Sequence, residues 1–123
     1  MPTPRTKLGT RGEELAQRFL KDQGYLILET NYRCAWGEID IVAQEGDELV
    51  FVEVRTRRSA EYGSPEESLT PAKARRLVAA AEDYLQRLEG GEPGWRIDLI
   101  SVRLGQDYRV LRVDHLKSVE LPT

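Results

Sequence analysis

Two stretches rich in valine and isoleucine carry charged side chains at alternate positions, a pattern that predicts neighbouring β-strands. They cover residues 38–44 and 49–56, and the turn-forming segment 45–48, with Gly-Asp at its centre, lies between them. A tight turn at this segment predicts an antiparallel hairpin, in which the residue numbers of facing partners keep a constant sum. The resulting register places Asp40 opposite Glu53.

The predicted pairing of Asp40 with Glu53 is unfavourable unless something neutralises the two acids. Facing side chains have Cβ atoms about 5 Å apart, and two carboxylates at that distance repel by about 3 kcal/mol at an effective dielectric of about 20. A divalent cation would turn this repulsion into coordination, and Arg55 lies on the same strand face as Glu53. A purely structural alternative pairs Glu38 with Arg55 and lets Asp40 accept backbone hydrogen bonds.

A helix is expected before the hairpin. The segment Thr10–Glu13 has the form of a capping box, and Gly24 is a typical helix stop, so the helix should run from about Arg11 to Gln23. Glu13 is explained by the capping box, yet it also borders the inward face of this helix and could serve a site. Residues 1–9 are expected to form a flexible tail.

A second helix should begin at Thr70-Pro71, an N-cap followed by proline at the first helical position. Its apolar stripe consists of Leu77, Val78, Ala81, Leu85 and Leu88. Further strands are expected at residues 25–33, 95–102 and 108–113. These elements follow the order α-β-β-β-α-β-β, which is typical of an α/β fold. Residues 58–68 between the hairpin and this helix have no regular pattern, which fits either a functional loop or simple flexibility.

Composition limits what this domain can do. A chain of 123 residues is long enough for one domain and too short for two ordinary ones. Cys34 is the only cysteine, so an intramolecular disulfide and a CxxC metal site are excluded. The first residues lack the apolar region of a secretion signal and no stretch is apolar enough to span a membrane, so a cytoplasmic protein without a membrane partner is expected.

The formal net charge of -3 does not favour bulk attraction to a polyanion. Nucleic-acid binding would therefore need a local basic surface, and such a cluster exists around the end of the hairpin and the start of the second helix. Its members are Arg55, Arg57, Arg58, Lys73, Arg75 and Arg76. An ordinary solvated face explains this cluster equally well, and Lys73 in particular fits either a solvated first-turn lysine or a phosphate contact.

Four further residues have alternative interpretations. Trp36 and Tyr62 flank the acidic site in sequence and could stack on bases, although aromatic residues beside strands more often pack. His115 is the only histidine and is expected at the surface or an edge. Asp98 is either a fourth acid for the site, a partner of Arg96, or exposed.

Several motifs together resemble one bacterial family. They are Arg11-Gly12-Glu13, Gly37-Glu38-Ile39-Asp40, Phe51-Val52-Glu53-Val54-Arg55-Thr56-Arg57 and Thr70-Pro71-Ala72-Lys73. Over nearly the whole chain the sequence resembles the YraN family of uncharacterised bacterial proteins. That family is similar to the PD-(D/E)xK nucleases, which include Holliday junction resolvases and have a restriction-endonuclease-like mixed sheet flanked by helices.

The resemblance implies a single nuclease-like domain over residues 1–123, acting as a Mg²⁺-dependent or Mn²⁺-dependent endodeoxyribonuclease. Asp40, Glu53 and the Val54 carbonyl would bind the metal, and Glu13 would match a first-helix glutamate of the resolvase-like branch. Its substrate would be DNA, with branched or structured DNA as one option. Cutting both strands of a symmetric junction would require two sites and hence a homodimer.

Arg55 departs from the implied motif, which has lysine at this position. Arginine stays protonated, so Arg55 can act only as an electrostatic or phosphate-binding group. Lys73 could supply the missing ammonium group, and Arg57, Arg58, Lys73 and Arg76 are the expected nucleic-acid contacts. The alternative function is an inactive module that binds nucleic acid or a protein partner and retains the nuclease fold.

Overall fold

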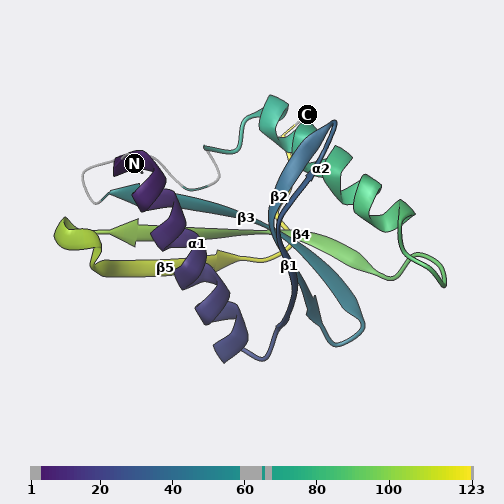
Figure 1. Ribbon diagram of the computed structural model, residues 1–123, viewed down its shortest axis with the longest axis horizontal. Helices are drawn as coiled ribbons and strands as arrows, with labels where there is room; N and C mark the ends of the chain where they lie inside the picture. Colours follow the sequence, from purple (N-terminus) through teal and green to yellow (C-terminus); the bar gives the residue numbers. More distant parts are fainter. Residues whose placement is uncertain (1–3, 59–64, 66–67, 123) are drawn as a thin grey trace.

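The computed structural model of the protein describes residues 4–58, 65 and 68–122, and it has the predicted α/β architecture (Figure 1). The elements follow the expected order α-β-β-β-α-β-β, with one added 3₁₀ turn before the last strand. They are α1 (Pro4–Asp22), β1 (Leu26–Cys34), β2 (Gly37–Glu45), β3 (Glu48–Arg58), α2 (Pro71–Gln86), β4 (Trp95–Leu104), η2 (Gln106–Tyr108) and β5 (Val110–Leu116).

The five strands form one mixed sheet in the spatial order β1-β2-β3-β4-β5. Strands β3 and β4 are parallel, and the other neighbours are antiparallel. Helix α2 connects the parallel pair, since parallel neighbours need a crossover rather than a tight turn. The prediction of a mixed sheet with flanking helices is therefore confirmed.

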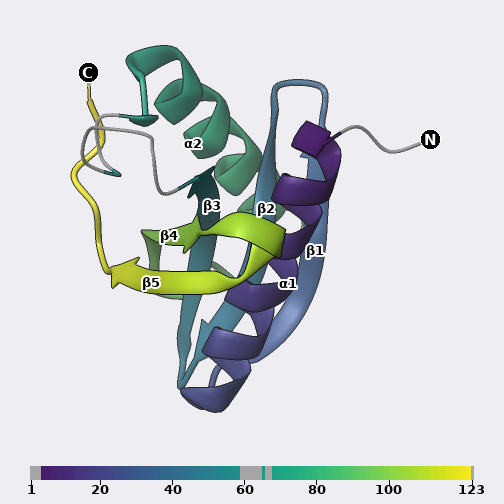
Figure 2. The same cartoon turned by 90° about the vertical axis from the view of Figure 1, so that its left-hand side faces the viewer.

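The two helices cover opposite faces of the sheet (Figure 2). On one face α1 inserts Ala16 and Leu20 into a core with Val50, Val52 and Val54 of β3. On the other face α2 inserts a different apolar set, and its buried members are Leu77, Ala80, Ala81 and Leu85. Strand β3 is thus covered on both faces, as is usual for a strand with a parallel neighbour.

Helix α1 begins at Pro4, so the expectation of a flexible tail over residues 1–9 is wrong from residue 4 onward. Thr10 lies inside the helix, and the capping-box explanation of Glu13 is wrong for the same reason. The earlier start has two physical causes. Proline is favourable at a first helical position, and Leu8 extends the apolar stripe backward by packing against the core. The predicted stop at Gly24 is confirmed, because Gly24 has φ +92° and the Tyr25 N–H donates to the Leu20 carbonyl.

The N-cap of α2 is also confirmed, because the Thr70 hydroxyl accepts a hydrogen bond from the Lys73 backbone N–H. In the irregular segment before it, Tyr62 and most of residues 58–68 lie outside the described residues. No helix in the described part of the chain combines the length and apolarity needed to cross a bilayer.

Candidate active site

Strands β2 and β3 separate at the position where the sequence predicts the acid pair. Their ladder has the predicted register from Glu45↔Glu48 to Ile41↔Val52 and then ends. The further partners expected for Asp40 and Glu38 are therefore absent from the backbone ladder. Strand β2 rotates here, because Ile39 packs on the α2 side of the sheet whereas Ile41 packs on the α1 side.

The Asp40 side chain bonds to β3 where the backbone of β2 no longer does. Its Oδ2 atom accepts a hydrogen bond of 2.7 Å from the Val54 backbone N–H. This contact satisfies a buried donor at the point where β2 turns away, since an unpaired backbone N–H is costly inside a protein. The backbone contact predicted for Asp40 in the structural alternative is confirmed.

Asp40 and Glu53 nevertheless share one electrostatic environment. Burial raises the pKa of Asp40 to about 6, and the charges of Glu13 and Glu38 add to this rise, against the Val54 hydrogen bond and Arg55. Burial also raises the pKa of Glu53 to about 8, and the negative charge of Asp40 is the next cause. The two carboxyl groups therefore favour retaining a proton, or binding a cation, over carrying two free charges.

Arg55 lies beside this pair without neutralising it fully. Its Nη1 atom is 4.0 Å from Glu53 Oε1, and its side chain is 30 % exposed. The buried Nε–H of Arg55 has no hydrogen-bond partner among the described residues. The structural alternative pairs Glu38 with Arg55, whereas the ion pair that Glu38 forms among the described residues is with Arg33, at 3.4 Å.

A polar pocket of about 140 Å³ connects these groups with the beginning of α2. Its lining residues are Glu38, Glu53, Arg55, Lys73, Arg76 and Leu77. Lys73 and Arg76 are exposed, and the positive charge of Lys73 lowers the pKa of Glu53. The pocket therefore has two acids and Arg55 on its strand side, and Lys73 and Arg76 on its helix side.

Glu13 reaches the acidic group from the other helix. Burial raises its pKa, a side-chain hydrogen bond with Asn31 lowers it, and the charges of Glu38 and Arg33 act in opposite directions. Its charge in turn raises the pKa of Asp40. Glu13 is thus near enough to Asp40 for its charge to act on that carboxyl group.

Two of the four expected nucleic-acid contacts lie elsewhere. Arg57 is only 7 % exposed, so it does not belong to the open cationic surface. Arg58 places its guanidinium 5.3 Å from the centre of the Tyr108 ring, on the α1 side of the sheet. Only Lys73 and Arg76 join Arg55 at the pocket.

The donor set suits a hard divalent cation with few protein ligands. The available oxygens are the carboxylates of Asp40 and Glu53 and the backbone carbonyl of Val54. No three His, Cys, Asp or Glu side chains of the described residues converge as a closed metal site would require. Mg²⁺ is commonly held by one or two carboxylates together with waters and phosphate oxygens. The raised pKa values of Asp40 and Glu53 agree with a place for such a cation.

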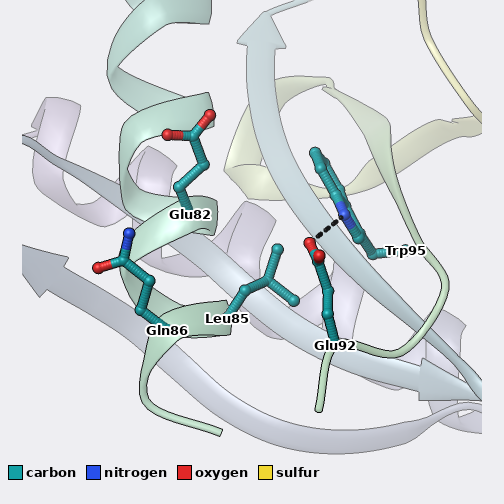
Figure 3. Close-up of a pocket in the computed structure, with 5 residues that line it drawn as sticks. All are labelled: Glu82, Leu85, Gln86, Glu92 and Trp95. Atoms are coloured by element: carbon teal, nitrogen blue, oxygen red, sulfur yellow. Dashed lines mark hydrogen bonds between the residues drawn. The ribbon is translucent and has the colours of Figure 1, made fainter.

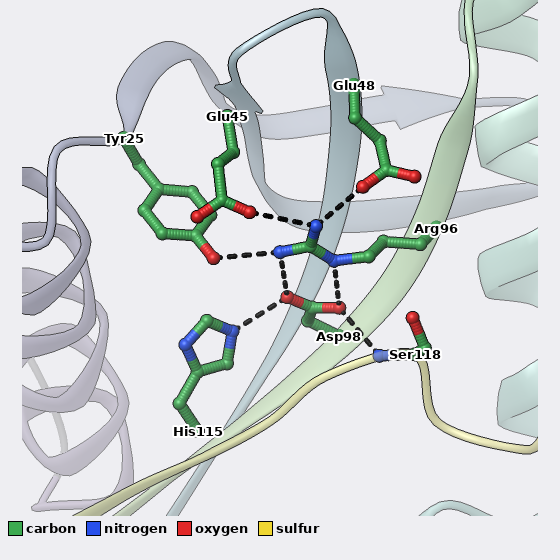
Figure 4. A network of polar contacts seen from close by, with 7 residues as sticks. All are labelled: Tyr25, Glu45, Glu48, Arg96, Asp98, His115 and Ser118. Atoms are coloured by element: carbon green, nitrogen blue, oxygen red, sulfur yellow. Dashed lines mark hydrogen bonds and ion pairs between the residues drawn. The ribbon is translucent and has the colours of Figure 1, made fainter.

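A second polar cluster, formed around Asp98, has a structural character (Figure 4). Asp98 is fully buried and accepts hydrogen bonds from Arg96 Nε at 3.0 Å and from the Ser118 backbone N–H at 2.9 Å. His115 Nε2 lies 2.7 Å from Asp98 Oδ2. Burial acts to raise the pKa of Asp98, but the hydrogen bonds outweigh it and lower the pKa.

These contacts confirm the predicted partnership of Asp98 with Arg96. The expectation of an edge position for His115 is also confirmed, because His115 lies on β5, the last strand of the sheet, whereas the expectation of a surface position is wrong. The imidazole is buried, with a side-chain exposure of 8 %, and it packs against the rings of Phe19 and Tyr25. Asp98 pairs with Val52 in the sheet and so points away from the face of Glu53. It is not a fourth acid of the pocket.

A larger depression of about 470 Å³ lies at the far end of α2 (Figure 3). Its lining residues are Glu82, Leu85, Gln86, Glu92 and Trp95, and the Trp95 indole N–H donates to Glu92. None of its described lining residues is cationic, unlike those of the smaller pocket between β3 and α2.

Sequence reasoning missed Glu38 as a pocket residue and Asn31 as the partner of Glu13. The alternation of β2 places Glu38 two residues before Asp40, which was an available signal. Asn31 gave no such signal, because its left-handed backbone conformation, φ 52°, appears only in three dimensions.

The fold and the pocket define a mixed α/β domain that gathers acids and cations where two central strands separate. The sequence matches the family described as "Uncharacterised protein family UPF0102" over residues 12–102. This chain belongs to that family, which confirms the resemblance predicted from the motifs. The matched range contains the whole acid pair, Arg55 and the beginning of α2.

Relatives from several bacteria cover nearly the whole chain. A UPF0102 protein of Caldicellulosiruptor saccharolyticus is 44 % identical over 112 residues, which is 91 % of this chain and 95 % of the relative. One from Dehalococcoides mccartyi is 50 % identical over 102 residues, or 83 % and 84 % of the two chains. One from Roseiflexus castenholzii is 46 % identical over 114 residues, or 91 % of each chain.

Proposed function

We propose that this protein is a metal-dependent endonuclease that hydrolyses phosphodiester bonds in DNA, including branched or structured DNA. The single observation that carries the proposal is the place of Asp40, whose carboxylate accepts from the Val54 N–H directly beside Glu53 on β3. Both acids have raised pKa values, and Glu53 lines a pocket whose other side is cationic. Such a site suits a divalent cation on one side and a phosphate group on the other.

Asp40, Glu53 and the Val54 carbonyl would hold Mg²⁺ or Mn²⁺. When bound, this ion supplies Lewis-acid activation of the phosphate and of a water molecule. Binding would also displace the proton that the acid pair retains, so we expect the affinity for the cation to increase with pH. Glu13 would add negative charge behind Asp40 and help to retain the cation.

Arg55 would bind the phosphate rather than activate water. Arginine does not lose its proton at working pH, which excludes it as a base. Its buried Nε–H lacks a described partner, and its guanidinium is 4.0 Å from Glu53, so a phosphate oxygen could accept from it beside the acids. Lys73 and Arg76 would hold the adjoining backbone phosphates.

A second candidate is a module that binds nucleic acid without cleaving it. The specific observation in its favour is Arg55, since the resemblance implies a lysine at this position. This alternative predicts DNA binding that weakens with salt and that survives the substitution Glu53→Gln. It needs the cationic side of the pocket but not the cation.

Cleavage of linear, nicked and four-way DNA in Mg²⁺ or Mn²⁺ tests the proposal. We expect cleavage by the native protein and a loss of about 100-fold or more in Asp40→Asn, the scale seen when transition-state charge loses one stabilising group. The matched control is Asp47→Asn, which makes the same chemical change at the exposed turn between β2 and β3 and should cleave normally.

Two results would contradict the proposed function. Equal cleavage by Asp40→Asn and the native protein would show that the activity does not depend on the acid pair. DNA binding without cleavage in either metal, retained in Glu53→Gln, would establish the binding module instead.

A further inference from the structure

Trp36 is an exposed aromatic side chain next to the proposed site. It lies in the turn between β1 and β2, and it is 71 % exposed. Among the described residues its ring makes no aromatic or cation–π contact. By contrast, the second tryptophan, Trp95, packs edge-on against Phe51 with ring centres 5.7 Å apart. An indole left in water has apolar faces that are available to a ligand.

The turn that carries Trp36 is fixed against α2. A Cβ atom added to Gly37 would lie 2.0 Å from the backbone carbonyl oxygen of Arg76, so the two backbones are in close contact. Arg76 lines the pocket, and so does Glu38, two residues after Trp36. The backbone next to Trp36 is therefore fixed against α2, close to two residues that line the pocket, and Figure 1 shows the β1–β2 turn beside α2.

Exposed arginines lie on the two segments next to this turn. Arg33 precedes Trp36 on β1 with a side chain that is 75 % exposed. Arg75 and Arg76 are exposed on α2 across the Gly37 contact. An exposed aromatic ring on a segment next to exposed arginines suits a ligand that carries a flat ring and phosphates together, which is the chemistry of a nucleotide with an accessible base.

We propose that Trp36 is a stacking platform for an unpaired base, so that the protein selects DNA with single-stranded nucleotides next to the phosphate in the pocket. This inference rests on one part of the proposed function, namely that the ligand is DNA, and it does not require cleavage. Bases inside a continuous duplex already stack on each other and cannot present a face to the indole. Single strands, flaps and open junctions can.

Tryptophan fluorescence tests this platform directly. The chain has two tryptophans, so Trp95→Phe leaves Trp36 as the only one. We expect a single-stranded oligonucleotide to quench its emission in a saturable manner, and a blunt duplex of equal length to quench it much less. The titration is performed with EDTA, which keeps the DNA intact.

Binding affinities measured by fluorescence anisotropy provide the second readout. Trp36→Ala should bind the single strand about 10-fold more weakly, within the range for losing one base–aromatic stack. Its affinity for the duplex should change less than about 2-fold. Trp36→Phe should recover part of the loss, because phenylalanine retains a ring. Leu26 is another exposed apolar residue, 60 % exposed and located on β1, so Leu26→Ala should bind as the native protein does.

Equal quenching by both DNA forms, or unchanged single-strand affinity in Trp36→Ala, would overturn the platform. These outcomes are distinct from failure of the proposed enzyme. A protein that cleaves DNA without quenching of Trp36 contradicts the platform alone. Selective quenching without cleavage in Mg²⁺ or Mn²⁺ supports the platform and contradicts the enzyme.

Discussion

Glu53 and Asp40 are held in the folded protein in an environment that opposes their charge. Burial is the main cause for both residues, and each is also affected by neighbouring acids. The fold therefore loses free energy when these groups ionise, unless a cation compensates. A purely structural ion-pair network would neutralise both carboxylates and avoid this loss of free energy. The uncompensated acids therefore favour a functional role for the pair.

Replacing Glu53 with glutamine should make the protein less sensitive to alkaline pH. The pKa of Glu53 rises from 4.5 to about 8 on folding, so the native state binds a proton that the unfolded state releases between these values. The free energy of unfolding of the native protein should therefore fall as pH rises from about 5 to about 8. The amide in Glu53→Gln stays neutral, so the variant should gain about 1–3 kcal/mol over the native protein across this window.

Urea unfolding at pH 5, 6, 7 and 8, without divalent cations, measures this difference. Glu14→Gln, at an exposed position of α1, provides the baseline for a glutamate-to-glutamine change. If the free energies of unfolding of Glu53→Gln and the native protein differ by the same amount at every pH, folding does not raise the pKa of Glu53, and the prediction is wrong.

Individual residues were predictable where sequence spacing alone determines their neighbours. Thr70 as an N-cap and Gly24 as a helix stop are examples, because both roles depend on local backbone geometry. His115 was not predictable in this way. Its partner Asp98 is on another strand, and β4 and β5 are joined by an irregular turn with a register shift at Arg103/Leu104.

Helix α1 depends on one close approach to the sheet. A Cβ atom on Gly12 would lie 1.7 Å from Thr56 Oγ1 and under 3 Å from the rest of that side chain. Gly12 therefore lets the helix backbone rest directly on β3, next to the segment that carries Glu53 and Arg55. This contact also fixes where Glu13 stands relative to the acid pair.

Gly12→Ala and Gly9→Ala should have opposite effects on stability. The first should destabilise the protein by about 1–3 kcal/mol, because an overpacked side chain must displace its neighbours. The second should stabilise it by about 0.5–1 kcal/mol, since nothing lies within 4 Å and alanine favours the helix. Thermal unfolding of both variants measures this contrast. Equal stability would show that α1 does not pack closely on Thr56.

The β2–β3 hairpin shows both the strength and the limit of sequence pattern. Its register was predictable, because the two-residue turn at Gly46-Asp47 sets the pairing of Glu45 with Glu48. The separation beyond Ile41 was not, because it arises from long-range packing. Ile39 joins the α2 side of the core, and this rotation of β2 removes Asp40 from the ladder.

At the scale of the whole molecule, the stabilising polar cluster around Asp98 and the acid pair with its unfavourable charge lie in different places. Asp98, Arg96 and His115 form a satisfied network on the α1 side of the sheet. The acid pair lies at the divergence of β2 from β3, and its pocket opens on the α2 side. The element order was predictable from periodicity and turns. The burial of β3 on both faces was not, because it depends on the parallel pairing of β3 with β4, which is visible only in the structure.

Calorimetric titration of Mn²⁺ into the native protein at pH 8, with Asp40→Asn and Asp47→Asn in parallel, tests the central claim most directly. At pH 8 the proton on the acid pair competes less with the cation than at lower pH, because the pKa of Glu53 is about 8. Cation binding should therefore be stronger at pH 8 than at lower pH. We expect the native protein and Asp47→Asn to bind with the same affinity, and Asp40→Asn to bind at least about 10-fold more weakly. Identical binding heats for Asp40→Asn and the native protein would contradict a cation site at Asp40 and Glu53.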